Sequence, residues 1–210
     1  MRRAWCLEAQ VWLNAPRQSG NAGGSGLLEC TVPATTFVDA VGLFRGFLRT
    51  RDIELADVLS CESFDLDDWD YKKYPQDSPM RRHILHVVEN NCIWCSDLSP
   101  LPPPLAGMPS QRARFFLIKA SILEEIVPGA KGKTAYAMYA MPPRTLDEAL
   151  AELPGLVAER QMRMVDVVRM SLLEDWDERR GPEERESCKA LVKAVARGRV
   201  WHGPVIFGPA

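Results

Sequence analysis

The sequence predicts an α+β fold built from two tandem, internally duplicated units, each with the element order β-β-α-β-α-β. Three observations predict it: the chain aligns with itself, a proline-rich stretch separates the matching halves, and strand and helix periodicities alternate in the same order on both sides. We expect the first unit over residues 1–98, a linker over 99–111 and the second unit over 112–210. Each unit is expected to be a small sheet with its helices packed on one face.

The internal repeat is the most informative feature of the chain. Residues 27–58 align without gaps on residues 136–167, and a two-residue deletion then places Trp69 and Trp94 on Trp176 and Trp201. Because tryptophan is rare, two matched pairs indicate duplication rather than chance. Identical pairs in the first block are Pro33/Pro142, Thr36/Thr145, Ala40/Ala149, Gly46/Gly155, Arg51/Arg160, Asp57/Asp166 and Val58/Val167.

Proline content marks the boundary between the units. Residues 99–110 carry five prolines, which favour an extended spacer with few backbone donors. A ligand for an SH3-like domain has a similar composition, but matching sequence on both flanks favours the spacer.

In the first unit, branched and aromatic residues predict strands, and a glycine-rich stretch over 18–26 suits a hairpin connection. Pro33 ends the second strand, and Thr35 or Thr36 can cap the helix that follows. Apolar residues at helical spacing lie on one face of that helix. In order, we expect strands Ala4–Leu13 and Leu27–Val32, a helix bearing Phe37, Ala40, Val41, Phe44 and Leu48, strand Ile53–Phe64, helix Ser78–Asn90 and a short strand at Trp94.

The second unit repeats this order with two differences. Pro142 is expected to end its second strand, and Pro154 with Gly155 should kink or break the helix that Thr145 caps. Both second helices precede a residue suited to the left-handed conformation, Asn91 or Gly198. In order, we expect strands Arg114–Leu123 and Ala135–Met141, a helix after Thr145, strand Met162–Leu172, helix Glu183–Arg197 and a short strand at Trp201.

Composition excludes several classes of protein. The 210 residues carry a net charge of −2 and 46% hydrophobic residues, which describes a globular chain and argues against a nucleic-acid binder. No window is long and apolar enough for a membrane span, and Glu8 and Gln10 interrupt the stretch that follows the first arginines. The six scattered cysteines without an export signal predict reduced thiols and a cytoplasmic location.

One constellation has the residue types of a zinc site. His83 and His86 are followed by Cys92 and Cys95, and imidazoles with thiolates are the ligands of tetrahedral zinc. Two points weigh against it: the thiols of an extended Cys92–Cys95 segment point to opposite faces, and the second unit has Ala190, Lys193, Arg199 and His202 at these places. The same CxxC is a weak redox motif, because it follows a helix rather than preceding one.

Acidic residues surround a tryptophan at the same place in both units, over 65–70 and 174–178. Trp69 is most simply a core anchor, with the carboxylates as turn formers and solvated charge. A basic partner would bind the more acidic first turn, at Asp65, Asp67, Asp68 and Asp70, and a divalent cation is a weaker alternative.

Two functions follow from these patterns. The first is a non-catalytic module that binds another protein, of which inhibitor or immunity-type proteins that neutralise an enzyme are one class. The second is a metal-binding or enzymatic protein with a site at His83, His86, Cys92 and Cys95. No nucleophile and base arrangement is recognisable, so no catalytic residue is predicted. We favour the first function.

Overall fold

The computed structural model describes residues 2–13, 24–67, 69, 75, 77–100, 112–123, 129, 131–173 and 182–207, with the side chains of 100 and 182–188 outside the description. Most of the expected linker, Asp68, Asp70 and the acidic turn over 174–178 lie outside the described residues. The fold is α+β, and the described residues form nine strands and four helices. The chain divides into two compact units, Met1–Pro109 and Ser110–Ala210. In the described residues, no helix has the length and apolar character needed to cross a membrane.

The first unit is an antiparallel sheet whose central strand pairs on both sides. β1 pairs with β2 and with β3, and β2 also pairs with the two short strands β4 and β5. Thr36 caps α1 by accepting from the Asp39 backbone, and Ser78 caps α2 in the same way from Arg81. The bounds are β1 Arg3–Leu13, β2 Ser25–Pro33, α1 Phe37–Arg49, β3 Ile53–Asp65, α2 Pro79–Glu89, β4 Trp94–Cys95 and β5 Ser99–Pro100.

The second unit repeats this order and pairing, except that β5 has no counterpart among its described residues. β6 lies between β7 and β8, and β7 also pairs with β9. Its bounds are β6 Arg112–Ile122, β7 Thr134–Arg144, α3 Leu146–Ala158, β8 Met162–Leu172, α4 Pro182–Ala196 and β9 Trp201–Phe207.

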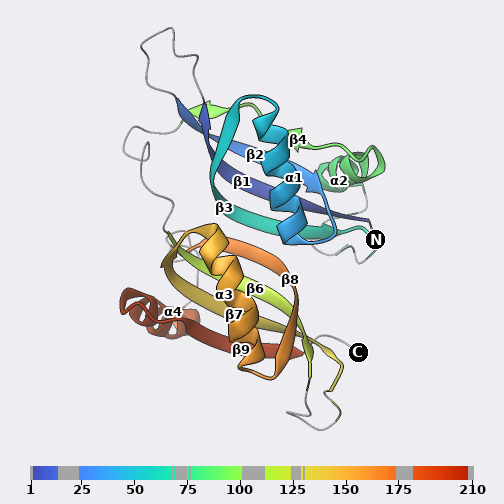
Figure 1. Cartoon of the computed structure of the whole chain (residues 1–210). Helices are drawn as coiled ribbons and strands as arrows, with labels where there is room; N and C mark the ends of the chain where they lie inside the picture. The colour runs from blue at the N-terminus through green and yellow to red at the C-terminus, as the bar shows by residue number, and fades with distance from the viewer. Residues whose placement is uncertain are drawn as a thin grey trace. The chain divides into compact units, whose positions relative to one another are not determined.

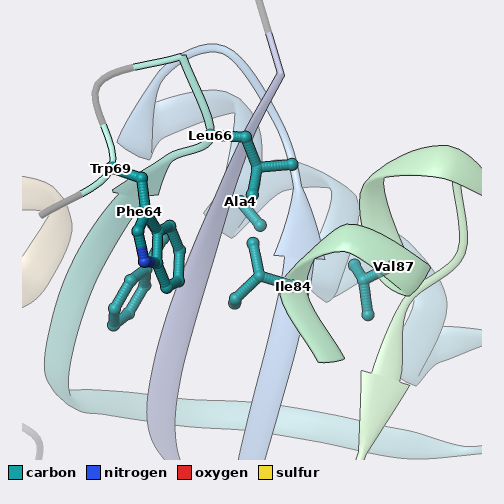
Figure 2. Packing of buried hydrophobic residues seen from close by; sticks show 6 residues of the cluster. All are labelled: Ala4, Phe64, Leu66, Trp69, Ile84 and Val87. Atoms are coloured by element: carbon teal, nitrogen blue, oxygen red, sulfur yellow. The ribbon is translucent and has the colours of Figure 1, made fainter. Parts of the chain in front are cut away.

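The helices of each unit lie on opposite faces of its sheet, so the prediction that they pack on one face is wrong. Neighbouring residues of a strand point to opposite faces. Trp5 packs on Phe37 of α1 with ring centroids 5.4 Å apart, whereas Ala4 belongs to the cluster that Ile84 and Val87 of α2 complete. Figure 1 shows α1 lying across the strands, and Figure 2 shows the cluster on the α2 side, where Trp69 lies beside Phe64.

The same arrangement holds in the second unit. Phe116 is paired with Tyr139, whose hydroxyl donates to the Leu156 carbonyl of α3 at 3.4 Å. Phe115 points the other way, into a cluster with Leu191 and Val195 of α4. The central strands β1 and β6 both bury consecutive residues, because each sheet has a helix on both of its faces.

Two proline-based expectations in the second unit need correction: the strand does not end at Pro142, and the helix does not break at Pro154. β7 extends to Arg144 and therefore includes Pro142, and α3 is continuous through Pro154. Leu153 and Val157, on either side of that proline, are fully buried on the same face of the helix. Burial of this apolar face offsets the one backbone hydrogen bond that proline removes.

Candidate functional site

Three glutamates lie on the α2-side face of the first sheet. Glu8 of β1, Glu29 of β2 and Glu62 of β3 all point to this face, because Glu8 is directly opposite Glu29 and Glu62 is opposite Cys6. We call Glu8, Glu29 and Glu62 the carboxylate face. Glu29 is exposed and the other two are half-buried.

Cys6 lies on the same face, and its thiol senses the charges of Glu62 and Glu29. Burial raises the pKa of the Cys6 thiol to about 11, its hydrogen bond to Thr31 lowers it, and the charges of Glu62 and Glu29 raise it further. Glu8 accepts a hydrogen bond from the Ser60 hydroxyl at 3.2 Å. Among the described residues, neither Glu8 nor Glu29 has an ion pair.

Glu8 and Glu29 form a like-charge pair, because they are direct cross-strand neighbours. Such a pair destabilises a sheet by a few tenths of a kcal/mol or more. The second unit has Leu117 opposite Met138 at the equivalent register, where both pack toward α4. The first unit therefore carries an electrostatic cost that its counterpart lacks.

An aromatic edge borders the carboxylate face. Trp94 of β4 is opposite Thr31 and has 43% of its surface exposed. The His83 ring meets Trp94 edge-on at 4.7 Å, and its Nε2 lies 3.0 Å from the Thr31 hydroxyl. Burial, and then the neighbouring His86, lower the pKa of His83. His83 is thus a packing residue that holds Trp94 at the sheet edge.

The four residues of the zinc hypothesis do not come together as one ligand set. His83 contacts Thr31 and Trp94, and the Nδ1 of His86 lies 3.1 Å from the Asn90 amide nitrogen. The Cys95 sulfur is 3.0 Å from that of Cys30. In the part of the chain that the structure describes, no three His, Cys, Asp or Glu side chains are placed to hold a metal ion.

Asp65 and Asp67, two of the four predicted partner-binding residues, make contacts within the chain. Asp67 accepts hydrogen bonds from the Arg2 guanidinium at 3.3 Å, and Asp65 accepts one from the Asp67 backbone at 3.0 Å. Asp68 and Asp70 lie outside the described residues. Trp69 is buried against Phe64, with ring centroids 5.9 Å apart, which confirms its prediction as a core anchor.

The thiol pair Cys30 and Cys95 was not foreseen from the sequence. No local spacing relates the two residues, and only the antiparallel pairing of β2 with β4 brings them together. Cys30 donates to Cys95 on the α1-side face, opposite to the face that carries Cys6 and Thr31. The one available sequence signal was the short strand predicted at Trp94, which is next to Cys95 in the chain.

No protein-family model, curated protein or solved structure matches this chain.

Proposed function

We propose that this chain is a non-catalytic protein-binding module, and that the carboxylate face receives a basic surface of another protein. The observation that carries the proposal is the direct opposition of Glu8 and Glu29 on neighbouring strands. Residues kept at an electrostatic cost mark places where function rather than stability selects the side chain. A cation delivered by a partner would remove that cost.

The surroundings favour a protein partner over a small cation. Trp94 provides an exposed aromatic ring, and aromatic residues are enriched at the centres of protein interfaces. The carboxylates are spread over three strands and do not form a metal-binding group among the described residues. Arginine and lysine side chains suit such a spread, since several can contact separate carboxylates at once.

The experiment is affinity capture with the purified full chain, followed by binding measurements on the identified partner at two salt concentrations. We expect a basic partner whose affinity falls at least tenfold when Glu8 and Glu29 are both changed to Gln, and falls with rising salt. Glu89→Gln is the control for loss of a carboxylate elsewhere, because it removes one charge from the exposed end of α2 in the same unit. Equal affinity of the double variant and the wild type would contradict the proposal.

An inhibitor or immunity-type protein is the narrower form of this proposal. It requires that the captured partner be an enzyme and that the wild-type chain reduce its activity, while the Glu8→Gln, Glu29→Gln variant does so less. A partner whose activity is unchanged by the complex would remove this narrower role. The alternative, a metal-binding or enzymatic protein using His83, His86, Cys92 and Cys95, has no ligand set among the described residues to support it.

We also infer that the two units are copies of one ancestral unit. Backbone conformation supports this: Asp52 and Gln161 have φ of 55° and 56°, and Asn91 and Gly198 have φ of 47° and 70°, at aligned positions after the helices. The strand register supports it too, because Cys30 opposite Cys95 matches Tyr139 opposite His202.

A chimera tests the relationship. Residues 37–49 would replace residues 146–158, so that the apolar face of α1 packs on the second sheet. We expect cooperative thermal unfolding of the chimera, whereas a scrambled version of the same segment abolishes it. Loss of cooperative unfolding in both would contradict the inferred equivalence.

A further inference from the structure

The two cysteines on β2 and β4 have the geometry that a disulfide needs. Cys30 and Cys95 are directly opposite in the antiparallel register, and their sulfurs are 3.0 Å apart. The Ser96 backbone donates to the Glu29 carbonyl at 2.8 Å, which makes the adjacent cysteines a non-hydrogen-bonded pair. In such pairs the Cα atoms are about 4.5 Å apart, within the range that disulfides span.

The environments of the two sulfurs assign them different roles. Cys95 is half-buried on a short edge strand, whereas Cys30 is 2% exposed. The hydrogen bond from Cys30 lowers the pKa of Cys95, burial opposes this, and the charge of Arg51 lowers the pKa further. The same hydrogen bond, and then burial, raise the pKa of Cys30. Cys95 is therefore the better nucleophile and reacts with the oxidant first. Cys30 is the thiol that then attacks the oxidised Cys95.

We propose that Cys30 and Cys95 are a redox modification site, which hydroperoxides oxidise to a reversible disulfide between β2 and β4. The Cys95 thiolate attacks one peroxide oxygen, the O–O bond breaks, and the released oxygen takes a proton to leave as water or an alcohol. The sulfenic acid formed on Cys95 is then attacked by the Cys30 sulfur. The S–O bond breaks, and the hydroxide combines with the Cys30 proton to leave as water.

The other thiols on the described strands are less suited to resolve Cys95. Cys6 lies on the opposite face of the sheet, where its sulfur is 3.6 Å from the Thr31 hydroxyl oxygen. Cys61 is opposite Leu7, which places the central strand between it and Cys30. The neighbour in the CxxC, Cys92, precedes the paired strand and lacks the register contact that Cys30 has.

The test uses the purified full-length chain, reduced and then treated with stoichiometric hydrogen peroxide. Peptide mapping should show one linked peptide that carries Cys30 and Cys95, and dithiothreitol should release it. Cys92→Ser is the matched control and should give the same linked peptide at the same rate. A dominant Cys92–Cys95 link, or a Cys30 that stays reduced, would overturn the proposal.

Two further variants separate the roles. Cys95→Ala should leave Cys30 unreactive, while Cys30→Ala should trap Cys95 as a sulfenic acid that a dimedone probe labels. Cys30→Ala should also raise the pH midpoint of Cys95 alkylation, because the hydrogen bond that favours its thiolate is lost. An unchanged midpoint in a folded Cys30→Ala variant would contradict the assigned pairing. The oxidised wild type should melt roughly 5–10 °C higher than the reduced protein.

Discussion

The two units use one pairing pattern with opposite chemistry on one of their sheet faces. The sheet face under α1 in the first unit and the sheet face under α3 in the second are both buried and largely apolar. Leu7 and Phe116 lie at aligned positions on these faces. On the other face, the first unit has the carboxylate face, whereas the second has Leu117 and Met138 packed near α4. On the same face the second unit presents Arg169 directly opposite Leu117, and Arg163 farther along, both exposed.

The difference shows which positions the shared pairing pattern constrains. A face covered by a helix along its whole length requires apolar side chains, because burying an unpaired charge is costly. A face that its helix covers only in part leaves strand positions open to other selection. On the α2-side face the first unit has like charges at these positions, whereas on the α4-side face the second unit has apolar and basic residues.

The largest expected effect tests the face that both units share. Phe44 of α1 and Leu153 of α3 are aligned and fully buried. Each change to Ala should lower the free energy of unfolding by about 2–5 kcal/mol, through lost burial and the cavity left behind. Urea unfolding measures this. A loss below about 1 kcal/mol for one of them would show that the two helices do not play equal parts.

A glycine in the second unit tests close packing on its α4-side face. A Cβ at Gly203 would lie 2.5 Å from the Trp201 ring and 2.8 Å from the Met138 Cβ. Gly203→Ala should therefore lower the free energy of unfolding by about 1–3 kcal/mol. Gly155→Ala is the control, because nothing lies within 4 Å of its added Cβ, and in a helix it should stabilise by about 0.5–1 kcal/mol. Equal effects of the two changes would contradict this packing.

Helix capping gives the next effect and a pH signature specific to the second unit. Thr36→Ala and Thr145→Ala should each cost about 1 kcal/mol. Among the helices whose N-terminal residues the structure describes, α3 alone has a capping box, in which the Thr145 backbone and then its hydroxyl donate to Glu148 and lower the pKa of that carboxyl. A lowered folded-state pKa means that this stabilisation is present above the ordinary carboxyl pKa and is lost as pH falls through the lowered value.

Thermal unfolding between neutral and acidic pH measures that signature. The difference in stability between wild type and Glu148→Gln should shrink as the pH is lowered past the carboxyl range. A difference that stays constant with pH would mean that the ionised form of Glu148 does not stabilise α3.

The smallest effect separates the units most directly. Glu29→Gln should raise the free energy of unfolding by about 0.5 kcal/mol, because it removes the repulsion with Glu8. Chemical denaturation at low salt measures it, and high salt should reduce the gain. A loss of stability would show that the carboxylate of Glu29 contributes to the fold instead of opposing it.

The local signals in the sequence were sufficient for most elements of both units. Thr36, Ser78 and Thr145 cap helices because their side chains can accept from nearby backbone amides, and this depends on neighbours a few residues away. Strand Met162–Leu172 has the predicted bounds for a similar reason. Expectations based on proline failed where packing outweighed its local cost: β7 continues through Pro142, and α3 does not break at Pro154.

The sequence alone determined the order of most elements and the caps at Thr36 and Thr145, because these depend on short-range spacing and residue type. The tertiary structure decided which residues meet. It paired Cys95 with Cys30 instead of Cys92, placed Glu8 opposite Glu29, and put the helices of each unit on opposite faces. Strand register joins positions far apart in the chain, and a shift of one residue would turn every side chain to the other face.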